Sequence, residues 1–112
     1  MFLNTPKSLL ENIPTELPNE LLETLESTAN LQIERIVSKG HASPPDFWYD
    51  QPRHEWVLLI EGAARLEFED GWVDMKRGDY ISIPAHVRHR VAFTDPALTT
   101  IWLAIHHGGP LA

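Results

Sequence analysis

Two side chains that could do chemistry, Glu55 and His89, stand at the starts of the strand-like segments "EWVLLIEG" and "HRVAF". Side chains alternate between the two faces of a strand. Arg88 and Arg90 should face solvent, which points His89 inward, whereas Glu55 shares a face with Val57. If that face is also inward, a carboxylate and an imidazole meet inside the fold. There they would ligate a metal ion or form a buried ion pair.

Other polar side chains near these segments could complete a site. Asp50 and Gln51 precede the first segment and carry oxygen donors, although Asp50 would otherwise only cap a turn. His86 lies in the loop before the second segment, where it could contact a metal or a substrate, or lie in solvent. His54 directly precedes the glutamate and should face away from the site, unless a β-bulge turns it inward.

Aromatic residues are expected to fill the interior because each buries a large apolar area. We expect Tyr49 and Phe93 to contact a substrate, or to be core or pocket wall only. His106 and His107 end the last strand-like segment on opposite faces, and we interpret them as part of a frayed terminus.

The elements that must hold these residues are mostly strands. Segments with alternating or continuous apolar residues follow one another from residue 31 to residue 107, separated by turn residues such as Asp70-Gly71. Before them, leucines at helical spacing in 18–28 predict a short helix. We therefore predict an all-β fold, an antiparallel sandwich or small barrel. Residues 1–30 would form an N-terminal segment with the helix, and residues 31–112 the barrel domain.

Composition narrows the classes of function. A net charge of -7 over 112 residues disfavours nucleic acid and anionic membranes as partners. The absence of cysteine excludes disulfides, thiolate metal sites and a cysteine nucleophile. We see neither a signal-peptide pattern nor an apolar run of the roughly 20 residues that would span a membrane, and we expect a cytoplasmic protein.

The spacing of five residues resembles the two sequence motifs of the cupin family. Glu55 and Gly62 match the end of the first motif, E-x6-G, and the second motif, G-x5-P-x-G-x2-H, is matched by Gly78, Pro84 and His89. The resemblance covers most of the chain. It implies a small single-domain cupin, whose fold is an antiparallel β-barrel or jelly roll.

Cupins bind a divalent metal through two histidines and a glutamate of the first motif and a histidine of the second. The resemblance therefore implies that Glu55 and His89 are metal ligands, but the His-x-His pair of the first motif is missing. Depending on the loop length, its two positions fall either on Trp48 and Asp50 or on Tyr49 and Gln51. An oxygen-rich set with Asp50 and Gln51 would suit Mn or Fe, and Ni or Zn are further candidates.

The resemblance leaves two classes of function open. One is a metal-dependent dioxygenase, isomerase or decarboxylase that acts on a small molecule in the barrel. The other is a binding module or sensor that has lost its metal. The resemblance also suggests a homodimer, and the N-terminal segment could exchange between two copies.

Overall fold

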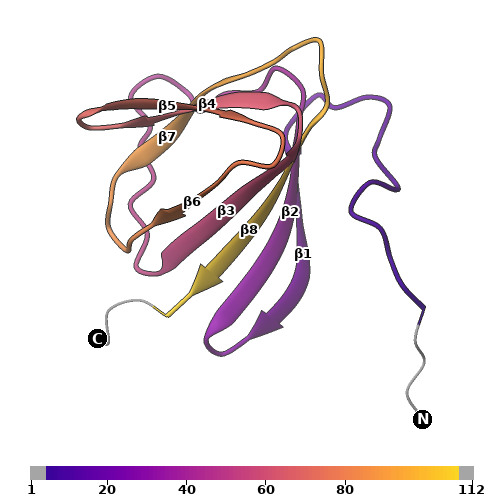
Figure 1. The fold of residues 1–112 in the computed structure, drawn as a ribbon, viewed down its shortest axis with the longest axis horizontal. Coiled ribbons are helices and arrows are strands. Elements are labelled where there is room, and N and C mark those ends of the chain that lie inside the picture. The colour runs from indigo at the N-terminus through magenta and orange to yellow at the C-terminus, as the bar shows by residue number, and fades with distance from the viewer. Residues whose placement is uncertain (1–4, 109–112) are drawn as a thin grey trace.

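The computed structural model describes residues 5–108, which form eight β-strands. Their bounds are β1 Leu21–Thr28, β2 Leu31–Ser38, β3 His54–Glu61, β4 Ala63–Phe68, β5 Gly71–Lys76, β6 Tyr80–Ile83, β7 His89–Thr94 and β8 Thr100–His107. A five-stranded sheet has the order β1-β2-β8-β3-β6, and a three-stranded sheet has the order β5-β4-β7 (Figure 1). All neighbouring strands are antiparallel. The predicted all-β antiparallel fold is confirmed.

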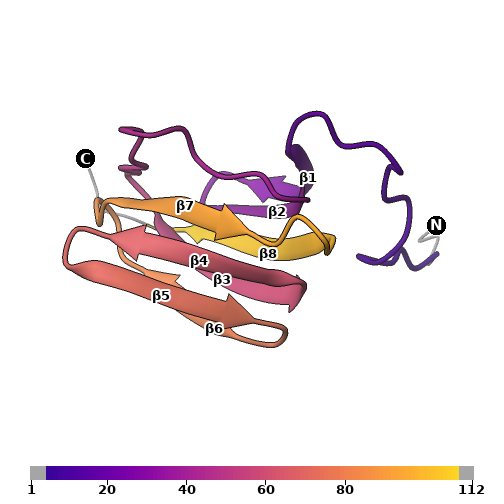
Figure 2. The ribbon, with the colours of Figure 1, turned by 90° about the horizontal axis from the view of Figure 1, so that it is seen from above.

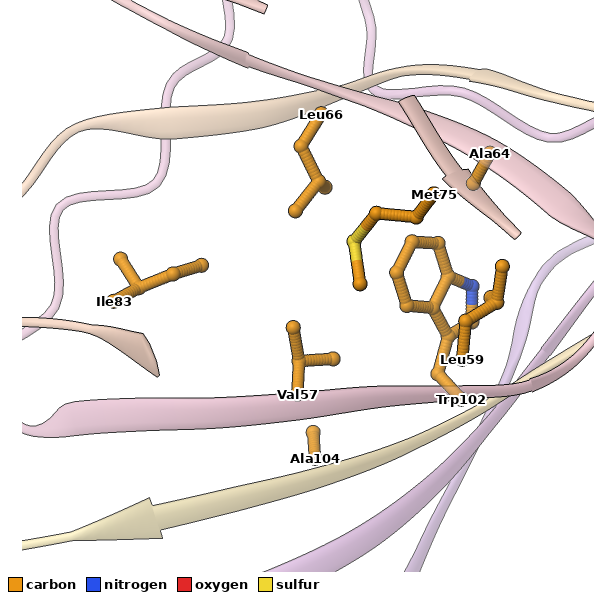
Figure 3. Packing of buried hydrophobic residues seen from close by; sticks show 8 residues of the cluster. All are labelled: Val57, Leu59, Ala64, Leu66, Met75, Ile83, Trp102 and Ala104. Carbon is orange, nitrogen blue, oxygen red and sulfur yellow. The ribbon is translucent and has the colours of Figure 1, made fainter. Parts of the chain in front are cut away.

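The core lies between the two sheets. Seen from above, the three-stranded sheet lies over β3, β6 and β8 of the larger sheet (Figure 2). Alternation in β3 sends Val57 and Leu59 into this space, where both are buried. They meet residues from four other strands, and the cluster comprises Val57, Leu59, Ala64, Leu66, Met75, Ile83, Trp102 and Ala104 (Figure 3). Burying one such large apolar side chain contributes about 1.5–3 kcal/mol.

The chain passes from one sheet to the other at Gly62, between β3 and β4. Gly62 has a φ of 96°, a left-handed conformation that favours glycine. A Cβ atom at this position would come within 2.6 Å of the Cα atom of Thr100, so there is no room for a side chain. The sharp passage between the sheets therefore depends on glycine.

The predicted N-terminal helix is wrong, because residues 21–28 form strand β1 instead. Every residue of β1 except Leu25 has a partner on β2, so the backbone hydrogen bonds that a helix would have made are replaced by the hairpin. An isolated helix of this length is marginal in water, and pairing with an existing sheet edge overrides the leucine spacing. The proposed domain boundary at residue 30 falls in the turn between β1 and β2.

Residues before β1 lie beside the sheet, against Arg35 of β2. The Arg35 side chain is buried and donates hydrogen bonds to Glu23 of β1 and to the carbonyl oxygens of Leu9 and Glu11, at 2.7, 3.0 and 2.6 Å. One guanidinium thus holds the N-terminal segment of its own chain against the outer face of the sheet. The described residues form no helix that is long and apolar enough to cross a membrane.

Candidate binding site in the barrel

A cavity of about 80 Å³ lies inside the barrel, between the two sheets. Each strand except β5 contributes one apolar side chain to the cavity wall. These residues are Leu22, Ile36, Val57, Leu66, Ile83, Val91 and Trp102. Its polar wall comprises Glu20, Glu34, Tyr49, Gln51, Glu55, His89 and His106. The cavity is large enough to hold more than one water molecule, which needs about 10–15 Å³ measured in this way.

Glu55 and His89 face each other across this cavity. Their Oε1 and Nε2 atoms are 3.2 Å apart, and their side chains are only 12% and 6% exposed. The Nδ1 atom of His89 lies 2.9 Å from the carbonyl oxygen of Val87, which can only accept, so Nδ1 carries a proton. In a neutral ring Nε2 would then present a lone pair to a carboxylate. The contact with Glu55 therefore favours a proton on Nε2 as well.

The charge state of His89 follows from these two contacts. Burial lowers its pKa, but the contact with the Glu55 carboxylate and the hydrogen bond to the Val87 carbonyl together raise the pKa above its usual value. The two side chains are arranged as a buried imidazolium–carboxylate ion pair.

A second imidazole–carboxylate pair lines the same cavity. His106 Nε2 lies 2.7 Å from Glu34 Oε1, and both side chains are about 15% exposed. His106 is also the direct neighbour of Glu55 across the β3–β8 ladder, so both point to the same face. The sequence pattern placed His106 in a frayed terminus and did not single out Glu34. Side chains two residues apart on a strand share a face, so His106 lies on the same inner face of β8 as Trp102, and this alternation could have identified it.

Tyr49 and Gln51 enter the cavity from the segment before β3. Backbone hydrogen bonds in both directions pair Tyr49 with His89, and the phenol ring stacks on the imidazole at a centroid distance of 5.4 Å. Residues 49 and 51 therefore point inward, and of the two pairs of positions that the sequence left open for the missing His-x-His pair, this pair lines the cavity. Burial is the main cause that raises the pKa of Tyr49, and the negative charges of Glu20, Glu55 and Glu34 raise this pKa further. The phenol therefore stays protonated.

Two buried oxygen atoms in the cavity wall have no hydrogen-bond partner among the described residues. They are Gln51 Oε1 and Glu55 Oε1. The latter is close to His89, but the contact is not aligned as a hydrogen bond. Leaving a buried acceptor unpaired costs about 1–3 kcal/mol. That cost applies to Gln51 Oε1, whereas Glu55 Oε1 keeps its ion pair with His89 and can accept a further hydrogen bond from a molecule in the cavity.

Three other residues that the sequence suggested for the site lie outside the cavity. Asp50 and His86 pair with each other through Oδ1 and Nδ1 at 2.7 Å, and more than half of each side chain is exposed. Phe93 was expected on the same face as His89 and Val91, but it is 48% exposed. The ladder between β4 and β7 shifts register between Val91 and Phe93, which turns Phe93 to the outside.

His54, the neighbour of Glu55, faces away from the cavity as expected. Its Nδ1 atom accepts a hydrogen bond of 2.9 Å from the backbone amide of Ala85, in the loop after β6. This histidine fixes a loop and does not contribute to the polar wall of the cavity.

The donor set at the cavity does not fit a metal held as the motif resemblance implies. In residues 5–108, no three His, Asp, Glu or Cys side chains gather closely enough to hold an ion. Glu55 and His89 are two strong donors and Gln51 adds only an amide oxygen, while His106 is already paired with Glu34. Protein metal sites usually take three or four protein ligands.

Comparison with known proteins agrees with the fold. A family model described as "Cupin domain" matches residues 34–106. A proposed mannose-6-phosphate isomerase from Ralstonia eutropha JMP134 is 42% identical, with a TM-score of 0.90, and the match covers 95% of this chain and all of that chain. No curated protein matches the sequence.

More distant structures share only the fold. A cupin superfamily protein from Desulfitobacterium hafniense DCB-2 has 20% identity and a TM-score of 0.71, over 85% of this chain and 83% of that chain. A conserved protein of unknown function from Streptococcus pyogenes has 18% identity and a TM-score of 0.76, over 100% of this chain and 93% of that chain. These matches and the family model all describe one small barrel.

Proposed function

Because this chain belongs to the cupin family, we propose that its barrel cavity binds a small polar organic molecule through Gln51 and Glu55. The observation that carries the proposal is the buried Gln51 Oε1 atom, which has no hydrogen-bond partner among the described residues, beside Glu55 Oε1, whose one contact is the poorly aligned ion pair with His89. A ligand that donates two hydrogen bonds would relieve the unfavourable burial of both acceptors. The apolar wall around them would hold the carbon skeleton of the ligand.

The test is ligand-observed NMR with a panel of small alcohols, amines, amides and sugars. Wild-type protein is compared with Gln51→Leu, which keeps the approximate size of the side chain and removes the acceptor. We expect at least one compound to bind the wild type and to bind this variant about tenfold more weakly, the loss of one hydrogen bond. The matched control is Asp50→Asn, an adjacent exposed position that points away from the cavity.

Equal weakening by Asp50→Asn and Gln51→Leu would contradict the assignment of the site, because only one of these side chains lines the cavity. No binding by any member of the panel would contradict the proposed function itself. Circular dichroism of both variants establishes that their strands are intact before binding is compared.

A second candidate is an isomerase that moves a proton within its substrate. Two imidazole–carboxylate pairs face one cavity, an arrangement that can supply both a general acid and a general base. The name of the Ralstonia relative points to the same reaction class. Incubation with mannose or mannose 6-phosphate in D2O should then place deuterium on a substrate carbon, and His106→Gln should reduce the rate. Absence of incorporation would contradict this candidate for these two sugars.

A further inference from the structure

The cavity wall carries an excess of negative charge. Three carboxylates, those of Glu20, Glu34 and Glu55, face two imidazoles, those of His89 and His106. Even with both imidazoles protonated, three negative charges against two positive charges leave a net charge of -1. Among the described residues no lysine or arginine lines the cavity, so nothing else compensates this charge.

Two arginines near the barrel have largely buried side chains, and both form hydrogen bonds outside the cavity. Arg35 faces the N-terminal segment on the outer face of β2. Arg90 lies on the outer face of β7, where it donates to Glu67 at 2.8 Å and to the carbonyl oxygen of Ser43 at 2.9 Å. Neither guanidinium can therefore bind an anionic group inside the cavity.

We infer that the ligand of this cavity is a small organic ammonium ion. The inference rests on the proposed function and specifies the class of ligand. Gln51 Oε1 has no hydrogen-bond partner among the described residues, and Glu55 Oε1 has only its ion pair with His89; both atoms are acceptors and call for donors. An ammonium group has three N–H donors and no acceptor, and its charge complements the wall. A short alkyl chain would pack against residues such as Val57 and Leu66.

The same charges act against phosphorylated or carboxylated ligands. Phosphate groups in proteins are normally held by arginine, lysine, a metal ion or backbone amides at a helix N-terminus. The cavity wall has no cationic side chain of this kind, and the described residues form no helix. A sugar phosphate, which the name of the Ralstonia relative implies for that protein, would place its anion beside three carboxylates.

The experiment compares three four-carbon probes with different polar groups: n-butylammonium chloride, n-butanol and sodium butyrate. Each is titrated into the full chain at neutral pH and constant ionic strength, and binding is followed by the backbone amide shifts of Val57 and Leu66 in the cavity wall. We expect butylammonium to bind at least about tenfold more tightly than butanol, and butyrate to bind more weakly than butanol.

Variants test whether the cavity charge causes this preference. Glu34→Gln removes one charge from the wall and keeps a group that can bond to His106, so the preference for butylammonium over butanol should fall several-fold. Glu26→Gln is the matched control, because Glu26 lies on β1, is exposed and does not line the cavity. It removes the same charge from the outside and should leave the preference unchanged.

The outcomes distinguish a wrong class of ligand from a wrong assignment of the binding site. Equal binding of butanol and butylammonium, or tighter binding of butyrate, would overturn the ammonium assignment and leave the proposed binding function standing. Failure of butylammonium to bind, when another compound of the NMR panel binds at the cavity, would do the same. If no compound shifts the two amides, both the assignment and the proposed function fail.

Discussion

At the scale of single residues, the ion pair between Glu55 and His89 ties the stability of the barrel to pH. Both side chains are almost completely buried, and the pKa of His89 is raised. A histidine with a raised pKa in the folded state stabilises the fold fully below its unfolded pKa of about 6.5. That contribution is lost as pH rises through the folded pKa. It amounts to about 1.4 kcal/mol for each pH unit that separates the folded pKa from the unfolded pKa.

We predict that Glu55→Gln reverses this dependence. Without the carboxylate, burial dominates and lowers the pKa of His89, so the variant loses stability as pH falls below about 6.5. The free energy of unfolding is measured with urea between about pH 5 and pH 9. The values for the wild type and for Glu55→Gln should converge at high pH, where His89 is neutral in both proteins. NMR titration of the His89 ring gives the direct check: a wild-type pKa below about 6.5 would contradict the prediction.

We predict that the purified, untagged protein holds much less than one metal ion per chain. Glu55, His89 and Gln51 provide too few strong donors, and a proton competes for the imidazole. Elemental analysis after incubation with Mn, Fe, Ni and Zn salts checks this, with the Glu55→Gln, His89→Ala double variant beside the wild type. Near-stoichiometric metal in the wild type that is absent from the variant would instead support the metal site that the family resemblance suggested.

The sequence led to half of the polar site. Motif spacing brought out Glu55 and His89, and the flanking Arg88 and Arg90 pointed His89 inward by alternation. His106 was underestimated because it lies near the end of a strand, where alternation is usually weak evidence. Phe93 was misplaced because the register shift in β7 has no glycine or proline to mark it. Gln51 was one of two neighbouring possibilities until the pairing of Tyr49 with His89 fixed which residues face inward.

At the scale of elements, the passage from β3 to β4 and the hairpin of β1 and β2 show what local patterns can and cannot predict. Gly62 was evident from the motif, and the structure gives its physical reason, a positive φ beside the Thr100 backbone. Strand β1 was predicted as a helix, because two adjacent leucines followed by a third fit a helical face. Whether residues 21–28 form a helix or a strand depends on pairing with β2, and the leucine spacing within this segment carries no information about that pairing.

We predict that Gly62→Ala destabilises the protein far more than Gly78→Ala. The two glycines have similar φ values, 96° and 90°, so the conformational strain of an alanine is about equal, roughly 1 kcal/mol. A Cβ at Gly62 would also collide with Thr100, whereas a Cβ at Gly78 meets nothing within 4 Å. Urea denaturation should show an additional loss of about 2 kcal/mol or more for Gly62→Ala.

The pair of variants separates the collision from the backbone conformation, since Gly78→Ala reports the conformation alone. Similar midpoints for the two variants would mean that Thr100, at the start of β8, can move far enough from Gly62 to admit the methyl group. The strand passage would then be less constrained than the distance to Thr100 indicates.

At the scale of the whole molecule, the outer face of the larger sheet is more apolar than an isolated barrel requires. Trp56 and Leu58 of β3 pair with Ile105 and Leu103 of β8, and all four point away from the core and are partly exposed. Adjacent apolar side chains in the middle of a sheet are typical of an interface between subunits.

We predict that two copies of the chain associate through this face. Leu103→Lys should convert a dimer into a monomer, because it buries a charge in the contact, and light scattering after gel filtration measures the mass directly. Removal of residues 1–19 should leave the dimer intact, since Arg35 holds this segment against its own chain. A wild-type monomer at about 100 µM, or a dimer that Leu103→Lys does not weaken, would contradict the prediction.

The position of Trp102 gives this barrel an optical property. Of the four tryptophans in the chain, Trp102 is 3% exposed and lines the cavity, whereas Trp72 is 61% exposed on β5. Trp48 and Trp56 lie outside the cavity wall. Indole emission shifts to shorter wavelength in an apolar environment, so the blue edge of the fluorescence spectrum is dominated by the indole at the cavity. A chain with phenylalanine at the other three positions would carry a single tryptophan, located at the cavity, with no label attached.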